Sequence, residues 1–182
     1  MVVLQNRLAR LSARELDWCV RLQRRSRRPL LRGLFVVVSR LGNGVFWYAL
    51  MLWLLIGYGW QAVPAVGHML LSGLLGLLAY KGLKSKTTRL RPYVSHCGIE
   101  ALVAPLDEYS FPSGHTLHAV GFTTIAVYFF PGLAWLLLPF TVLVALSRPI
   151  LGLHYPSDVV VGAMLGLGIA LSVLGFFNLL GV

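Results

Sequence analysis

Five apolar segments restrict what this chain can fold into. A helix needs about 20 residues to cross about 30 Å of hydrocarbon, and five segments come close to that length: 43–60, 64–80, 113–130, 133–147 and 158–180. Charged residues make up only 12% of the 182 residues, against about 25% in soluble domains. The sequence therefore predicts an all-α integral membrane bundle of about five transmembrane helices, without a cleavable signal peptide.

The first 32 residues are rich in arginine and differ from the rest of the chain. On a helix these arginines form one stripe, because they recur at three, four or seven residues: Arg7, Arg10, Arg14, Arg21, Arg24 and Arg28. Another face carries leucines: Leu4, Leu8 and Leu11. We expect residues 1–32 to form an interfacial amphipathic helix that ends near Pro29, and residues 33–182 to form the membrane-embedded domain. The stripe is either a topology signal or a site of specific lipid recognition.

The basic residues are unevenly distributed. Of the 16 Lys and Arg, ten lie in the first 40 residues, five lie between Lys81 and Arg91, and the last is Arg148. With five crossings all of them face one side, which the positive-inside rule assigns to the cytoplasm. We expect a protein of the bacterial inner (cytoplasmic) membrane, with its active site at the membrane surface; the cytoplasmic side is favoured and the periplasmic side is the alternative. Nucleic acid is not an expected partner, because the basic residues are not interleaved with aromatic residues in a groove and match no known binding motif.

Three polar segments interrupt the apolar pattern, at 84–92, 112–115 and 147–158. Counting crossings places all three at the same membrane surface, so folding can gather them into one pocket. They supply cations, a hydroxyl group, a glycine, two imidazoles and a carboxylate: Lys84, Arg91, Arg148, Ser113, Gly114, His115, His154 and Asp158. Guanidinium groups and the free N–H groups of a helix start both suit a tetrahedral oxyanion.

Two histidines in this set can carry out chemistry. His154 and Asp158 are four residues apart, and on a helical turn the carboxylate can accept one imidazole N–H. The other ring nitrogen is then free to attack phosphorus, while His115 protonates the departing oxygen. No cofactor is expected. A metal route has little support, since only six residues are acidic and one of them lies beyond position 108.

These residues resemble the signature of the type 2 phosphatidic acid phosphatase superfamily, which is related to vanadium haloperoxidases. The signature has three parts, found here as Lys84 with Arg91-Pro92, Pro112 to His115, and Ser147-Arg148 with His154 and Asp158. The resemblance covers about residues 40 to 180. It implies a helical bundle, catalytic roles for His154, His115 and Asp158, and phosphate binding by the other members: Lys84, Arg91, Ser113, Gly114 and Arg148. Two features depart from the pattern: Pro149 follows Arg148 directly, and many members have six spans.

The resemblance also implies a function. We expect a metal-independent membrane lipid phosphatase that forms a phosphohistidine and acts on a lipid phosphate or diphosphate, of the undecaprenyl diphosphate, phosphatidic acid or phosphatidylglycerophosphate type. A lipid phosphotransferase, and a noncatalytic lipid-phosphate binder or transporter on the same scaffold, are the alternatives. The sequence leaves the oligomeric state open.

A few other residues have more than one interpretation. His118 either lines the lipid entrance or bonds a neighbouring helix, and His68 is expected to be a packing residue. The loop 93–111 is expected to cover the pocket. Cys19 and Cys97 are expected to be unpaired thiols.

Overall fold

The computed structural model describes the backbone of residues 2–26 and 28–181, and the side chains of residues 12–26, 28–179 and 181. Over these residues the regular structure is helical. The long helices are α1 (Val2–Arg25), α2 (Pro29–Leu41), α3 (Val45–Tyr58), α4 (Val63–Thr87), α6 (Gly114–Phe129), α7 (Ala134–Ile150) and α8 (Pro156–Leu180). Three short elements complete the order: α5 (Pro92–Ser95) and two 3-10 turns, Gly59–Ala62 and Pro131–Leu133.

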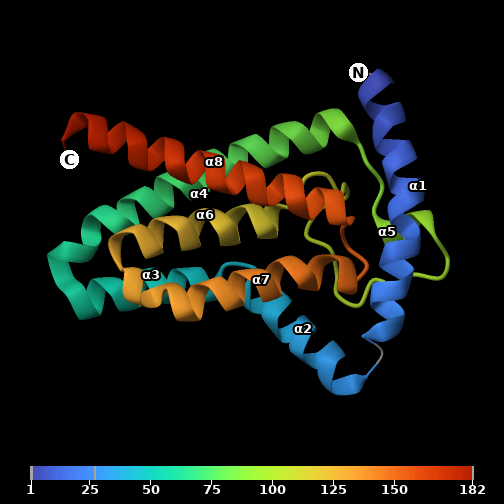
Figure 1. The fold of residues 1–182 in the computed structure, drawn as a ribbon, viewed down its shortest axis with the longest axis horizontal. Helices are drawn as coiled ribbons and strands as arrows, with labels where there is room; N and C mark the ends of the chain where they lie inside the picture. Colours follow the sequence, from blue (N-terminus) through green and yellow to red (C-terminus); the bar gives the residue numbers. More distant parts are fainter. Residues whose placement is uncertain (1, 27, 182) are drawn as a thin grey trace.

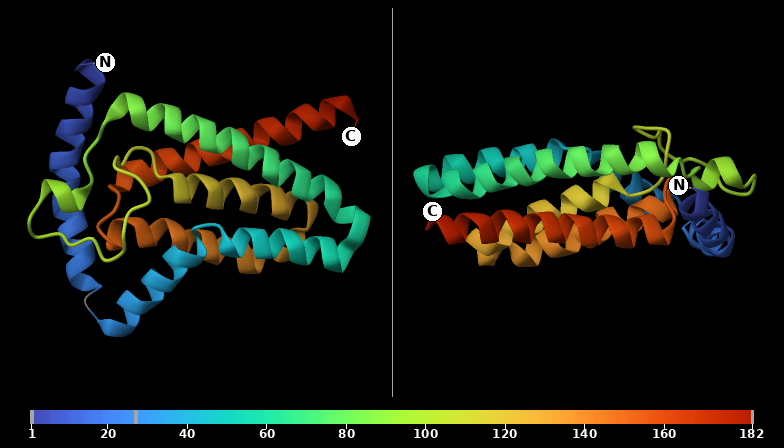
Figure 2. Two further views of the ribbon diagram at one scale, coloured as in Figure 1. Left: turned by 180° about the vertical axis from the view of Figure 1, so that it is seen from behind. Right: turned by 90° about the horizontal axis from the view of Figure 1, so that it is seen from above.

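Helices α3, α4, α6, α7 and α8 lie lengthwise beside one another and form the bundle (Figures 1 and 2). They correspond to the five apolar segments of the sequence. Within the described residues, three stretches are long and apolar enough to cross a membrane: Val45–Ser95, which contains α3 and α4, Pro131–Ile150 and Pro156–Leu179. The all-α membrane architecture is therefore confirmed. That all five helices span the bilayer stays a prediction, because α6 has only 16 residues.

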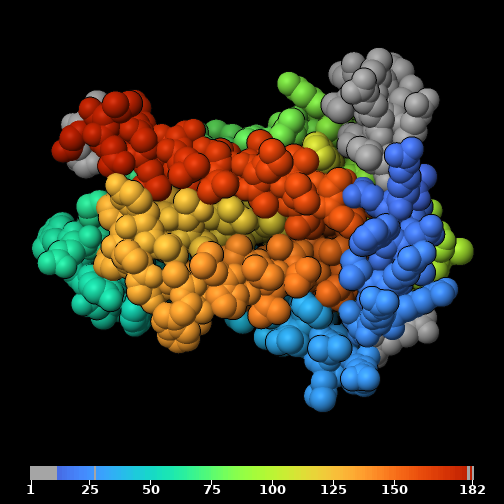
Figure 3. Space-filling model, in the orientation of Figure 1, coloured from blue at the N-terminus to red at the C-terminus, as the bar shows by residue number. Residues whose placement is uncertain are grey.

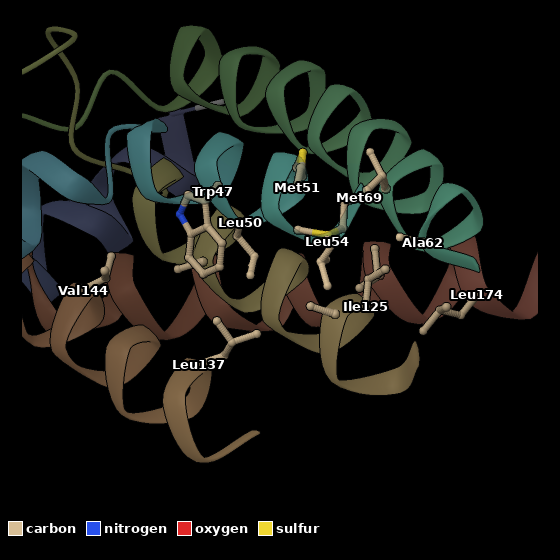
Figure 4. Packing of buried hydrophobic residues seen from close by; sticks show 14 of the residues in the cluster. Trp47, Leu50, Met51, Leu54, Ala62, Met69, Ile125, Leu137, Val144 and Leu174 are labelled. Carbon is tan, nitrogen blue, oxygen red and sulfur yellow. The ribbon is translucent and has the colours of Figure 1, made fainter. Parts of the chain in front are cut away.

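Large apolar side chains fill the bundle and also cover its outside. Trp47, Leu54, Met69, Ile125 and Leu137 are almost fully buried in the main core (Figure 4). Others of the same kind are largely exposed on the helix surfaces: Ile56, Leu78, Val160, Met164 and Leu171. An apolar exterior of this extent suits hydrocarbon rather than water, which agrees with the membrane assignment.

Helices α6 and α8 pack closely because α8 presents glycines to α6. A Cβ atom at Gly162 would lie 2.5 Å from the carbonyl oxygen of Ser113, and one at Gly166 would collide with the carbonyl oxygen of Leu117. Small residues allow helix backbones to approach in this way. The contact holds the first turns of α6 and α8 side by side, and both turns carry residues of the site described below.

The N-terminal region differs from the sequence prediction in one respect. Pro29 does not end the amphipathic helix: α1 ends at Arg25, and Pro29 begins α2. Proline fits the first turn of a helix, where its missing N–H would have no intrahelical partner. Of the predicted arginine stripe, Arg14, Arg21, Arg24 and Arg28 are exposed. The side chains of Arg7, Arg10, Leu4, Leu8 and Leu11 lie outside the described residues.

Helix α1 crosses one end of the bundle, next to the end of α7 and the start of α8 (Figure 3). The connections between α4 and α6 and between α7 and α8 lie at this same end, whereas the 3-10 turn after α3 and the C-terminus lie at the other (Figure 1). The three polar segments of the sequence are therefore gathered at one end of the molecule, as predicted.

Candidate active site

A cavity of about 370 Å³ opens at this end of the bundle. It is lined by six of the eight residues that the sequence singled out: Lys84, Arg91, Gly114, His115, Arg148 and His154. The other two, Ser113 and Asp158, are fully buried behind its wall. The structure thus brings the three segments together around one space.

His154 lies in the short connection before α8, and its backbone is held in place by Arg148. The His154 N–H donates to the Arg148 carbonyl over 3.3 Å. The ring Nδ1 lies 2.7 Å from the carbonyl oxygen of Ser110, which can only accept, so Nδ1 carries the proton and Nε2 keeps its lone pair. Nε2 lies 3.4 Å from Nη1 of Arg91. This tautomer leaves the Nε2 lone pair available for attack.

The charge state of His154 also suits a nucleophile. Burial lowers the pKa of its imidazole well below the ordinary value, and the positive charges of Arg91, Arg148 and Lys84 lower it further. The hydrogen bond to Ser110 acts in the opposite direction and is outweighed. The ring is therefore neutral at physiological pH.

Asp158 lies farther from His154 than the sequence predicted. Its Oδ2 is 3.6 Å from Nδ1 of His154, beyond normal hydrogen-bond distance. Oδ2 accepts the N–H of Tyr155 over 2.9 Å, and Oδ1 lies 2.5 Å from Nη1 of Arg89. The spacing of four would join the two groups on a helix, but α8 begins only at Pro156, so His154 is not on a helical turn. The carbonyl of Ser110 accepts the imidazole N–H instead.

His115 enters the cavity from the first turn of α6. Its Nε2 lies 2.5 Å from Oδ1 of Asn43, another cavity-lining residue. An amide oxygen only accepts, so this contact assigns the proton to Nε2 of His115. Sequence reasoning assigned no role to Asn43. Its position between Gly42 and Gly44 is a turn signal, and this was the one available hint.

Two of the three cations converge on a carboxylate of the covering loop. Oδ1 of Asp107 lies 2.5 Å from Nζ of Lys84 and 2.6 Å from Nη2 of Arg91. Lys84 also donates to the carbonyl of Tyr109 over 2.8 Å. Burial raises the pKa of Asp107, but its hydrogen bond to Lys84 and the charges of Lys84 and Arg91 outweigh this, and the net pKa is lowered. Asp107 is therefore ionised at neutral pH.

Arg148, the third cation, lies in the last turn of α7 and is only 3% exposed. Its Nη1 donates to Oγ of Ser39 over 3.0 Å. Its buried Nε has no hydrogen-bond partner among the described residues. Because unpaired buried donors are costly, this N–H is suited to an oxyanion in the cavity.

Ser113 and Gly114 form the start of α6. Ser113 is the N-cap, and its Oγ lies 3.5 Å from the N atom and 3.0 Å from Oγ1 of Thr116. The hydroxyl is thus engaged within the helix, whereas Gly114 lines the cavity. The first N–H groups of a helix lack intrahelical acceptors and favour an anion. The structure therefore places a helix N-terminus, rather than the serine hydroxyl, at the cavity wall.

His118 and His68 lie in different surroundings. His118 lines the cavity and stacks on Phe122 at 5.5 Å between ring centroids. His68 donates from Nδ1 to the carbonyl of Pro64 over 2.5 Å and packs against Phe129 and Phe177. These contacts support the packing interpretation of His68 and the cavity-lining interpretation of His118. Cys19 and Cys97 are both unpaired, as predicted.

Arg89 is the second residue that sequence reasoning missed. It is 5% exposed and bonds Asp158, but it lies outside the three-part signature. The sequence shows it only as one basic residue among the five between Lys81 and Arg91.

The fold and the cavity together define a helical membrane protein with a cavity at one end of its bundle that Lys84, Arg91 and Arg148 line. The sequence matches the PAP2 superfamily over residues 61–180, and the chain belongs to that family. It is 29% identical over 138 residues, 75% of this chain, to an undecaprenyl-diphosphatase of Sulfolobus acidocaldarius. The matched regions span between 45% and 66% of the lengths of the curated relatives.

Two solved structures have a similar fold. Aquifex aeolicus LpxE superimposes with a TM-score of 0.75 at 26% identity, covering 88% of this chain and 94% of the other. A PAP2-type phosphatidylglycerolphosphate phosphatase from Bacillus subtilis gives 0.69 at 26% identity, covering 97% and 95%. Both likenesses include the helical bundle that carries the cavity.

Proposed function

We propose that this protein is a metal-independent membrane phosphatase that hydrolyses a lipid phosphate or diphosphate. The observation that carries the proposal is one cavity that brings together the imidazoles of His115 and His154, three cations and the start of α6. Membership of the PAP2 superfamily supports it.

The reaction begins at His154. Its Nε2 lone pair attacks phosphorus and forms an N–P bond, while the bond from phosphorus to the lipid oxygen breaks. His115 acts from its protonated, imidazolium form, which the negative charge of a bound phosphate favours, and donates its Nε2 proton to that departing oxygen to become a neutral imidazole. Water then attacks the phosphohistidine, His115 takes up a proton from this water, and the N–P bond breaks to release phosphate. His154 is neutral before the attack and again after the N–P bond breaks, in agreement with its lowered pKa.

The remaining residues bind the charge that moves through this sequence. Lys84, Arg91 and Arg148 surround the transferring phosphoryl group, and the N–H groups at Gly114 add a helix N-terminus. Preorganised donors of this kind are commonly the largest catalytic term, with each worth about 10² to 10³ in rate. Asp107 must leave Lys84 and Arg91 before phosphate can reach both of them.

The same cavity supports a lipid substrate. Away from the charged residues its wall is apolar and comes from α3, α4 and α6, with Trp47, Met51, Leu70, Leu74 and Phe122. A lipid can therefore place its phosphate among the cations and its first carbons against this wall. Polyprenyl diphosphates, phosphatidic acid and phosphatidylglycerophosphate are the candidates. The first is the substrate type in the name of the Sulfolobus relative, and the third is that in the name of the Bacillus structure.

We place the active site at the cytoplasmic face of a bacterial inner membrane. All lysines and arginines with described side chains belong to α1, the junction with α2, α2 itself, the end of α4 with the following loop, or the end of α7. These segments lie at the cavity end of the bundle (Figure 1), and the positive-inside rule favours the cytoplasm for that end.

The test is phosphate release by purified protein in detergent, compared across the three lipid classes with a metal chelator present. Wild-type protein should release phosphate, vanadate should inhibit it, and His154→Ala should remove turnover without lowering the melting temperature by more than a few degrees. Appearance of the phosphoryl group on a second lipid would identify a phosphotransferase. Binding of lipid phosphate without any turnover would indicate a noncatalytic lipid-phosphate binder or transporter.

A further inference from the structure

Arg89 connects the N-terminal helix to the residues behind His154. Its side chain is 2% exposed, and its guanidinium reaches both α1 and the start of α8. Nε donates to Oγ of Ser12 over 2.9 Å, Nη1 to Oγ of Ser157 over 2.8 Å, and Nη2 to Glu15 over 2.7 Å. The 2.5 Å contact of Nη1 with Asp158 completes the set. The group also lies over the Tyr155 ring, 4.0 Å from its centroid.

Glu15 of α1 holds the other side of this network. Its Oε2 accepts from Arg89, and also from Oγ of Ser157 over 2.7 Å. Its Oε1 accepts the backbone N–H of Ser157, in the first turn of α8, over 2.7 Å. A carboxylate at that position satisfies a free helix N–H and interacts favourably with the helix dipole. Glu15 therefore fixes the turn of α8 that carries Asp158.

The network reaches His154 by two routes. Through its side chain, Arg89 holds Asp158, which accepts the N–H of Tyr155, the neighbour of His154. Through its backbone, the Arg89 carbonyl accepts from the N–H of Ser110 over 2.9 Å and from its Oγ over 3.2 Å. The carbonyl of Ser110 in turn accepts from Nδ1 of His154. Both the segment that bears the nucleophile and the orientation of its ring thus depend on Arg89.

We propose that Arg89 and Glu15 are positioning residues of this enzyme, and that α1 serves as part of the active-site framework through the series Glu15–Arg89–Asp158. The inference rests on the proposed phosphatase function. It assigns a role to a residue of α1, which lies outside the region 61–180 that matches the PAP2 superfamily.

Charge balance explains why both carboxylates are needed. A buried guanidinium is stable only when it is paired and its hydrogen bonds are satisfied. Asp158 and Glu15 share this task. Glu15→Gln leaves Asp158 as the one carboxylate on Arg89, and it replaces one of the two acceptor oxygens of Glu15 with an N–H donor, so either Arg89 or Ser157 loses its acceptor. The expected result is a small displacement of His154, and a displacement of about 1 Å can lower the rate about a hundredfold.

The experiment is a double-mutant cycle on lipid phosphate hydrolysis, with kcat and KM measured separately. Glu15→Gln should lower kcat about tenfold and change KM less than about twofold, because it moves the nucleophile and leaves the phosphate-binding cations in place. In the Asp158→Asn background the same change should cost less than about twofold, because the residue through which Glu15 acts is already lost. Arg89→Gln should behave like Glu15→Gln, with a larger loss, and Arg89→Lys should recover part of it.

Matched controls are available on the same segments. Asp17→Asn removes an exposed carboxylate two residues from Glu15, and Lys86→Gln removes an exposed cation three residues from Arg89. Both should leave kcat unchanged. Should Glu15→Gln fail to fold, Glu15→Asp takes its place. It keeps the charge, but its shorter side chain cannot contact Arg89 and Ser157 in the way that Glu15 does, so kcat should fall less than in Glu15→Gln, with the same dependence on Asp158.

Distinct outcomes overturn distinct statements. Wild-type kcat in Glu15→Gln, or an equal loss in the wild-type and Asp158→Asn backgrounds, overturns the positioning role of Glu15. A rise in KM at constant kcat does the same, since it would indicate a role in substrate binding. A wild-type protein with no turnover on any lipid phosphate overturns the proposed function itself.

Discussion

Nδ1 of His154 donates to the carbonyl oxygen of Ser110 over 2.7 Å, while the carboxylate of Asp158 stays 3.6 Å away. The tautomer of the proposed nucleophile is therefore fixed by a backbone carbonyl that no side-chain substitution removes. Asp158 accepts the N–H of Tyr155 and pairs with Arg89, so we expect it to act on the position of the segment that carries His154 rather than on the choice of tautomer.

This relationship predicts a partial loss for Asp158→Asn. The ring should keep its tautomer, but Arg89 loses one of its two carboxylates, and we expect kcat to fall by about 10² rather than the larger factor of about 10⁴ that a wrong tautomer causes. Rate measurement on a lipid phosphate, with the melting temperature as a check on folding, tests this. Activity as low as that of His154→Ala would contradict it.

Asn43 should affect the rate of the step in which His115 donates a proton to the departing oxygen. Asn43→Ala removes the acceptor that holds Nε2 of His115, and we expect kcat on lipid phosphates to fall about tenfold. An aryl phosphate with an acidic leaving group needs little proton donation, so the same variant should hydrolyse it at close to the wild-type rate. Asn43→Asp, which keeps an acceptor oxygen, is the matched control. Equal losses on both substrates would show that Asn43 has another role.

Asp107 should compete with phosphate for Lys84 and Arg91. Asp107→Asn removes the competing charge, so vanadate should inhibit at a concentration about five to ten times lower. Glu108→Gln, the same charge change at the exposed neighbour, should have no effect. Weaker inhibition of Asp107→Asn would mean that the carboxylate holds the two cations in place for phosphate.

The pH dependence of this competition follows from the lowered pKa of Asp107. Because the carboxyl pKa is lowered, the ion pairs of Asp107 with Lys84 and Arg91 contribute their full stabilisation at every pH above the ordinary carboxyl pKa of about 3.9. This stabilisation is lost only as the pH falls through the lowered pKa. The difference between wild type and Asp107→Asn in vanadate inhibition should therefore be constant from about pH 6 to pH 8.

The contact of α6 with α8 predicts opposite results for two glycines on one helix. Gly166→Ala should lower the melting temperature by several degrees, since its Cβ would meet the carbonyl of Leu117 and the helices would have to separate. At Gly168 nothing lies within 4 Å of an added Cβ, so Gly168→Ala should be neutral or slightly stabilising. Thermal unfolding in detergent measures both. Equal shifts would refute the close packing at Gly166.

Labelling of one thiol, that of Cys97, can show on which side of the membrane the site lies. Cys97 is exposed in the covering loop. Cys19 is fully buried, and burial raises the pKa of its thiol to about 12, with a further rise from Glu15, so Cys19 should not react. An impermeant thiol reagent should label inside-out membrane vesicles and spare right-side-out ones. Strong labelling of right-side-out vesicles would place the active site on the other face of the membrane.

Much of this molecule can be predicted from the sequence because its signals are local. Apolar runs of near-spanning length are sufficient to predict a helical membrane bundle, since that property depends on each segment alone. The spacings from Lys84 to Asp158 likewise predict which residues gather at one end of the bundle, once the three segments are counted to one side of the membrane. Pro29 was misassigned because proline is compatible with both the end of one helix and the start of another.

The tertiary structure decided the contacts between residues far apart in the chain. The sequence places His154 and Asp158 four residues apart, but only the fold shows that α8 starts after His154 and that Ser110 takes the imidazole proton. Arg89 and Glu15 are separated by 74 positions, and neither belongs to a pattern. Local chemistry determined which groups this protein carries, while the partner of each group was decided by packing, because a hydrogen bond depends on distances that the order of residues does not contain.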